Sequence, residues 1–311
     1  MSKHKKAWLA AAATLLVAGI VAAGYFYFRP AYRTPAELVS LLPTSDAVVG
    51  YADIDTLRRA GILKRFEESK ALEDPDYRIF VKETGLDYER DLDAIAIASI
   101  PDQLFGALRG RFDWARLNQY ATRHGGTCHN SYCRVPGGAS GRWLSFLPVR
   151  PDVMGLAISR DASAAYSLLP RHDAPTPAVP DYPVWLSLPH RALENPAALP
   201  AAGQIFAKAM SGANQVTLGI NGELAPSGSL NLTLHLKAQC PSPQKARELE
   251  TQLTQVTAFL KALTKQEKQE KQKAPAGGLA EMLAGGTFTQ VKNETRGRWR
   301  IPSGLIESLS Q

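Results

Sequence analysis

Two cysteines and two histidines gather in one short stretch of the chain, and these residue types could bind a metal or form a cross-link. Cys128 and Cys133 lie in the segment GGTCHNSYC, close to His124 and His129. Structural zinc sites need four such ligands held in a tetrahedron. Two cysteines on a tight hairpin can instead form a disulfide in an oxidising compartment. The residues leave a disulfide, free thiols and a metal site open. They favour the disulfide, with Cys240 left over, and we expect no metal.

A serine hydrolase would need a nucleophile on a sharp turn, with a histidine and a carboxylate to activate it. The nearest match is Ser140 in the segment GASGR, which lacks the final glycine and lies between expected short strands. A turn is the simpler interpretation. Three histidines lie apart from the cysteines: His172 in a proline-rich stretch, His190 at a helix entrance and His235 on the polar side of a strand. We interpret all three as surface residues.

Two acidic pairs could be proposed for acid/base work or for a cation. Asp53 and Asp55 precede an expected helix, where capping explains them, and Glu67 and Glu68 fit a solvated helix face. We therefore assign no catalytic residue. Neither a phosphate-binding loop of the GxxxxGK[ST] type nor a GxGxxG after a strand occurs, so we also expect no nucleotide cofactor.

The net charge of +7 does not indicate nucleic-acid binding. Three of the basic residues, Lys3, Lys5 and Lys6, stand together at the N-terminus, and the others are spread along the 311-residue chain. Nucleic-acid binding needs a clustered basic surface, so we expect no such partner.

The N-terminal segment predicts a membrane anchor. Positions 1–6 are basic, and the run from Ala7 to Phe28 contains no charge. About 20 apolar residues in a helix cross a bilayer, and the positive flank stays in the cytoplasm. A cleaved signal peptide is the alternative, with Ala22, Ala23 and Gly24 as a cleavage site. The apolar run is longer than a usual signal peptide's, which favours a single-pass anchor in the cytoplasmic membrane, N-terminus in, with the rest of the chain in the periplasm.

Five prolines between positions 170 and 183 predict an extended, exposed linker, because proline at this density continues neither a helix nor a central strand. The linker divides the exported chain into residues 34–169 and 184–311. Each part has a common domain size.

Both parts read as a strand, a helix, two strands, a helix, further strands and a final helix. In the segment 229–238, leucines alternate with polar residues, which predicts one buried and one solvated face. Ser242 and Pro243 begin a helix with a leucine stripe that we expect to pack on its own sheet. The other expected strands are 47–52, 92–100, 103–111, 133–135, 142–147, 153–159, 184–188, 215–221, 287–293 and 298–301. The other expected helices follow Asp53 and Asp113 or span 162–169 and 192–210.

The expected fold class is α+β: one transmembrane helix, then two similar lobes of mainly antiparallel sheet with helices on one face. The segment LLPTSDAVVGYADIDTL, from Leu41 to Leu57, follows shortly after the anchor. With the anchor it resembles the opening of uncharacterised bacterial envelope proteins that have a duplicated α+β exported region. The resemblance implies a bacterial, extracytoplasmic protein and supplies no catalytic residues.

These observations favour a non-enzymatic envelope protein that binds another protein, a peptide or an apolar ligand. The alternative is an extracytoplasmic hydrolase whose site is assembled from residues distant in sequence. A third possibility is an assembly factor that works through the membrane helix. Polar side chains converging in a deep pocket would favour the enzyme, and an open apolar groove or sheet edge would favour the binder.

Overall fold

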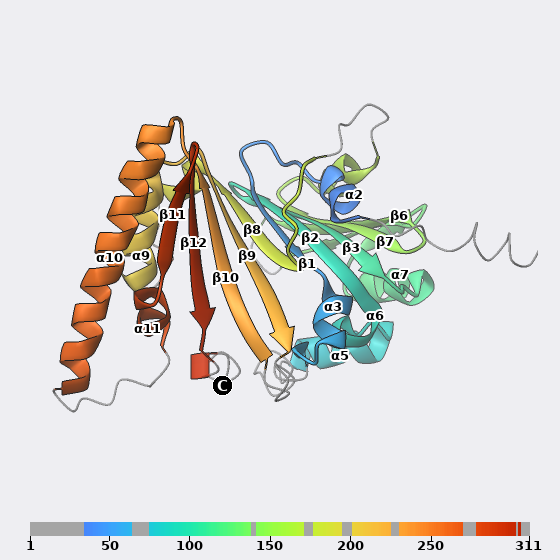
Figure 1. The fold of residues 1–311 in the computed structure, drawn as a ribbon. Coiled ribbons are helices and arrows are strands. Elements are labelled where there is room, and N and C mark those ends of the chain that lie inside the picture. The colour runs from blue at the N-terminus through green and yellow to red at the C-terminus, as the bar shows by residue number, and fades with distance from the viewer. Residues whose placement is uncertain are drawn as a thin grey trace, which may run out of the picture. The chain divides into compact units, whose positions relative to one another are not determined.

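The computed structural model describes residues 34–63, 75–137, 141–170, 177–194, 201–224, 230–269, 278–302 and 304–305. These residues form an α+β fold around one large antiparallel sheet (Figure 1). The expected fold class is confirmed at this level. The expected anchor, Ala7 to Phe28, lies outside the described residues, and no described helix is both long enough and apolar enough to cross a bilayer.

The strands are β1 (Val48–Ala52), β2 (Leu92–Ile100), β3 (Gln103–Gly110), β4 (Thr127–His129), β5 (Tyr132–Pro136), β6 (Trp143–Arg150), β7 (Val153–Ser159), β8 (Val184–Pro189), β9 (Gln215–Leu224), β10 (Leu230–Gln239), β11 (Thr287–Val291) and β12 (Glu294–Ile301). The helices are α2 (Pro35–Ser40), α3 (Ile54–Arg59), α5 (Pro75–Thr84), α6 (Tyr88–Asp91), α7 (Trp114–Arg123), α8 (His190–Leu193), α9 (Ala201–Ala209), α10 (Pro243–Gln269) and α11 (Leu279–Ala284), with short 3-10 helices η2 (Ala164–Leu168) and η4 (Met210–Gly212).

The sheet order is β11-β12-β10-β9-β8-β1-β2-β3-β7-β6-β5-β4, so the two parts of the chain meet where β1 pairs with β8. Outward from this central pair, one side runs β1, β2, β3, β7, β6 and the other runs β8, β9, β10, β12, β11. On each side a helical segment follows the first strand and another follows the first hairpin. The β4–β5 hairpin has no counterpart on the β8 side among the described strands.

Helix starts follow the caps expected from the sequence. The Asp53 carboxylate accepts a hydrogen bond from the Thr56 amide at 2.8 Å, and Asp113 caps α7 at the Arg116 amide. The Ser242 hydroxyl accepts from the Lys245 amide at the start of α10. Each cap satisfies an amide that has no partner within its own helix.

In the first half of the sheet, helices cover both faces, which differs from the expected single face. Leu38 and Val39 of α2 pack with the alanines of β2 on one face. Leu117 and Ala121 of α7 pack with Phe146 on the other. The cause lies in β2 (LDAIAIASI), which carries three alanines on one side and Ile95 and Ile97 on the other. A strand that is apolar on both sides needs a cover on each.

In the second half, the core lies on one face only. The leucine stripe of α10 packs there with Leu236 and Trp299, together with α9 and α11 (Figure 1). The expectation that this helix packs on its own sheet is confirmed. Leu263, at the end of the expected stripe, is exposed.

Two local expectations are wrong, and a third is only partly described. Residues 287–293 are not one strand, because Lys292 has a φ of 55° and turns the chain from β11 into β12. Of the helix expected over 192–210, the structure describes the end of α8, α9 and the start of η4, and residues 195–200 lie outside the described residues. The described part of the linker is not fully exposed, because Val179 and Tyr182 pack against the first-half core.

Candidate functional site

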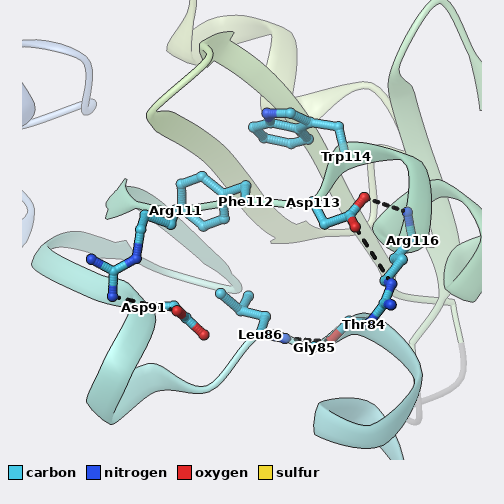
Figure 2. Close-up of a pocket in the computed structure, with 9 residues that line it drawn as sticks. All are labelled: Thr84, Gly85, Leu86, Asp91, Arg111, Phe112, Asp113, Trp114 and Arg116. Carbon is cyan, nitrogen blue, oxygen red and sulfur yellow. Dashed lines mark hydrogen bonds and ion pairs between the residues drawn. The ribbon is translucent and has the colours of Figure 1, made fainter.

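An open hollow of about 560 Å³ lies where the end of β3 meets α5, α6 and α7 (Figure 2). Two segments of chain form its wall, one after α5 and one between β3 and α7. The lining residues are Thr84, Gly85, Leu86, Asp91, Arg111, Phe112, Asp113, Trp114 and Arg116.

Asp91, the last residue of α6, supplies the most buried charge of the hollow. Its side chain is 11% exposed and pairs with Arg90 at 2.8 Å and with Arg111 at 3.4 Å. One carboxylate oxygen also accepts a hydrogen bond from the Asp87 amide at 3.0 Å. The hydrogen bond from Arg90 holds the pKa of Asp91 below its ordinary value, against the opposing effect of burial. Asp91 is therefore a fixed anion, not a proton donor.

The opposite wall is the N-terminal turn of α7. Asp113 accepts a hydrogen bond from the Arg116 amide as the helix cap, and its other carboxylate oxygen lies 3.4 Å from Arg116 Nε. Trp114 Nε1 donates to the Pro151 carbonyl at 3.1 Å, which fixes the indole. Its ring centroid is 5.3 Å from that of Phe112. The wall thus offers a tethered aromatic pair beside a guanidinium.

The Thr84 hydroxyl, which lines the hollow, already makes two internal hydrogen bonds. Thr84 is buried, donates to the Phe80 carbonyl at 2.7 Å and accepts from the Leu86 amide at 3.1 Å. Gly85 has a φ of 72°, and a Cβ there would lie 3.1 Å from Arg116 Nη1. The residue type therefore keeps this guanidinium close to the backbone.

The hollow has no nucleophile paired with a base among its lining residues. It presents two arginines, each already paired with an aspartate, beside two aromatic rings. Tryptophan and arginine are the side chains that dominate binding energy at protein interfaces. The arrangement can hold a polypeptide segment or another ligand with apolar and anionic groups.

Sequence reasoning found Asp113 and Trp114 only as a cap and a helix face, and it did not single out Asp91, Arg111 or Arg116. The available signal was a run of charged and aromatic residues, RFDW, between a strand and a helix. Loop positions of this kind often carry function.

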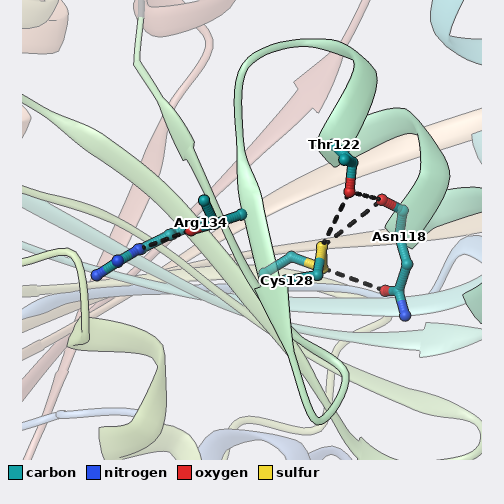
Figure 3. Close-up of a disulfide and its surroundings, with 6 residues drawn as sticks. Asn118, Thr122, Cys128 and Arg134 are labelled. Carbon is teal, nitrogen blue, oxygen red and sulfur yellow. Dashed lines mark hydrogen bonds between the residues drawn. A yellow bond between two sulfur atoms is a disulfide. The ribbon is translucent and has the colours of Figure 1, made fainter.

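The cysteine segment is a disulfide-closed hairpin (Figure 3). Cys128 of β4 pairs directly with Cys133 of β5, and their sulfurs are 2.00 Å apart. Asn130 and Ser131 both have positive φ, as a two-residue hairpin turn requires. Asn118 of α7 lies over the bridge, with Oδ1 3.2 Å from Cys133 Sγ. The bridge therefore sits between the hairpin and α7.

The histidines near the cysteines do not join them. His124 Nε2 lies 3.4 Å from Glu83 Oε2, and His129 is exposed on β4. In the described part of the chain, no group of three His, Cys, Asp or Glu side chains could hold a metal. The metal alternative for Cys128 and Cys133 has no support in this geometry.

The remaining candidates have structural roles or lie outside the described residues. Asp55 pairs with Arg58 and Arg59, next to the Asp53 cap. His190 Nδ1 lies 3.1 Å from the Ala213 carbonyl oxygen. His235 stacks with Tyr182 at a centroid distance of 5.3 Å. The candidates outside the described residues are Ser140, Glu67, Glu68 and His172.

No protein-family model and no curated protein matches the chain. A solved structure, crystal form I of TP0453, has a TM-score of 0.48 and 11% identity, over 89% of this chain and 98% of that one. A likeness at this level does not establish a shared function.

Proposed function

We propose that the chain is a membrane-anchored, extracytoplasmic binding protein whose hollow at Trp114 and Arg116 holds a segment of another envelope protein or a peptide. One observation carries the proposal: the hollow combines a tethered Trp114 with Arg111 and Arg116, and its hydroxyl and carboxylates are engaged in internal bonds. Such a surface gains affinity from aromatic and guanidinium contacts and has no group free to attack a substrate.

The anchored topology supports this function. The charge-free run from Ala7 to Phe28 after a basic tail is typical of a single-pass anchor with the N-terminus in the cytoplasm. A disulfide at Cys128–Cys133 is typical of an oxidising compartment such as the periplasm. The matching strand order on the two sides of β1 and β8 supports two similar lobes that arose by duplication.

Photo-crosslinking from inside the hollow tests the binding function. The full chain, in intact cells, carries a benzoylphenylalanine in place of Arg116, and a matched variant carries it in place of Arg160. Arg160 is also exposed but follows β7, away from the hollow. We expect a discrete polypeptide adduct from position 116 only, and a lower yield when Arg111→Gln is added.

Equal adducts at both positions, or none at position 116, would refute the proposal. Reaction of the full chain with a fluorophosphonate at a serine would establish the alternative hydrolase instead. The membrane topology of the chain is measured separately, by labelling cysteines of intact cells with a membrane-impermeant maleimide. We expect labelling of Cys128 only after reduction, and labelling only after lysis would place the chain in the cytoplasm.

A further inference from the structure

One face of the sheet changes character halfway across. Residues paired in register point to the same face, so the row Ala96, Tyr51, Trp185, Gly219, His235, Arg298, Thr287 marks a single face through seven strands. In the first half this face belongs to the core under α2 and η2. Tyr182 lies over Gly219 and His235. Beyond His235, the side chains of this face are mostly exposed.

The open end of the face is cationic. Arg296, Arg298 and Arg300 alternate along β12, about 7 Å apart, and all three are exposed. Lys237 of β10 is the register partner of Arg296. The only described acidic side chain of β10, β11 and β12 on this face is Glu294.

Glu294 neutralises only part of this charge. It pairs with Lys237 Nζ at 2.8 Å and with Arg296 Nη2 at 2.9 Å. Arg300 donates to Asn231 Oδ1 at 2.9 Å, a neutral partner. Arg298 makes no ion pair with a described residue, and it stands beside His235, whose pKa is lowered by burial and by the Arg298 charge. Two guanidiniums are thus left without a counter-charge from the described residues.

The chain enters the fold on this same face. Leu38 and Val39 of α2 pack on the core that includes Tyr51 and Trp185. Only residues 29–33 separate the proposed anchor from the first described residue, Thr34. Five extended residues reach at most about 18 Å. A bilayer that holds the proposed anchor therefore lies within reach of α2.

We propose that the cationic face, formed by Lys237, Arg296, Arg298 and Arg300, docks on the anionic phospholipid headgroups of the membrane that holds the anchor. Guanidinium groups bind phosphate oxygens in bidentate pairs, and cations near an anionic bilayer are drawn to it within a Debye length. This inference rests on the proposed anchor and not on the proposed ligand at Trp114. Its consequence is that the Trp114 hollow is presented in a fixed orientation to the membrane.

The test measures how close each face comes to the bilayer. The full chain is reconstituted into phosphatidylcholine vesicles with or without phosphatidylglycerol, which also contain a lipid with a headgroup quencher. An impermeant maleimide dye labels Thr289→Cys, the partner of Arg296 on this face, or Thr251→Cys on the exposed side of α10. The matched substitutions put the same probe on opposite sides of one sheet half.

We expect the dye at position 289 to be quenched only with phosphatidylglycerol, and the dye at position 251 to be unaffected. Neutralising Arg298→Gln and Arg300→Gln together should lower the ratio of docked to undocked protein by about 25-fold, at about fivefold per charge. High salt should act in the same direction.

Quenching that does not depend on phosphatidylglycerol, that is equal at the two positions, or that survives the double substitution would overturn the inference. Flotation of the chain with the vesicles is measured in the same samples. A chain that does not float refutes the anchor, whereas a chain that floats without quenching at position 289 refutes only the docked face.

Discussion

Position 219 requires glycine because the Tyr182 ring occupies the space that a side chain would fill. A Cβ built on Gly219 would lie 2.2 Å from Tyr182 Cδ2 and 2.4 Å from Cγ. Both distances are far below a carbon–carbon contact. In Gly219→Ala the Tyr182 ring must therefore move, and it loses both its stack on His235 and its packing on the first-half core.

The magnitude follows from two opposed effects. Forcing a methyl group into an occupied site costs about 1–3 kcal/mol. Glycine within a strand is itself about 0.5–1 kcal/mol worse than alanine. In a Tyr182→Ala background the first effect disappears and only the second remains, so the same substitution should become neutral or stabilising. The coupling energy between the two positions should be about 2 kcal/mol.

Urea unfolding of the full chain in mild detergent, followed by tryptophan fluorescence, measures the four members of this cycle. Gly212→Ala is the matched control, because a Cβ there meets no atom within 4 Å. The reasoning is refuted if Gly219→Ala costs no more than Gly212→Ala. It is also refuted if its cost is the same with and without the Tyr182 ring.

Three further predictions concern charge and redox state. The hydrogen bond from Arg90 lowers the pKa of Asp91, so this carboxylate stabilises the fold above its ordinary pKa of 3.8 and stabilises it less as the pH falls below that value. Asp91→Asn should therefore cost about 1–3 kcal/mol of unfolding free energy at neutral pH and should flatten the acid side of the stability–pH curve. An unchanged acid side would contradict this. Burial and the charge of Arg298 lower the pKa of His235 below 6.5, so the folded state binds the proton less tightly than the unfolded chain. The free energy of unfolding should therefore fall as the pH drops below 6.5, and urea titrations of His235→Asn across this range should lose that pH dependence. A pH dependence that persists in the variant would assign it to another group. Reductant should lower the free energy of unfolding by up to about 2 kcal/mol through loss of the short disulfide loop, and it should leave a Cys128→Ser variant unaffected.

The sequence predicted those parts of the fold that local rules decide. Asp53, Asp113 and Ser242 cap helices because a short side-chain acceptor before an apolar stripe satisfies free amides within its own turn. The β2–β3 hairpin was predicted because Pro101 and Asp102 interrupt two apolar runs, and Asp102 has the positive φ of a tight turn.

The hollow could not be predicted in the same way. Asp91 and Arg111 stand 20 positions apart, and their pairing depends on how α6 meets the end of β3. No local pattern encodes that meeting. The cationic row was not predicted for a different reason. The turn at Lys292 was not recognised from the sequence, so residues 294–297 were not assigned to a strand. Arg296 was then not seen to share a face with Arg298 and Arg300.

The two halves of the sheet differ in how their faces are covered, and this difference bears on the proposed membrane-facing surface. Alternating strands leave every sheet with two faces, and each face must be covered or polar. In the first half both faces are apolar, so α2 and α7 cover one each. In the second half α10 covers one face and the other carries arginines, with Tyr182 at the boundary. Solubility alone would be met by mixed charges on the open face. The arginine row departs from that pattern. This departure, together with the five residues between the proposed anchor and Thr34, supports our proposal that anionic headgroups are its partner.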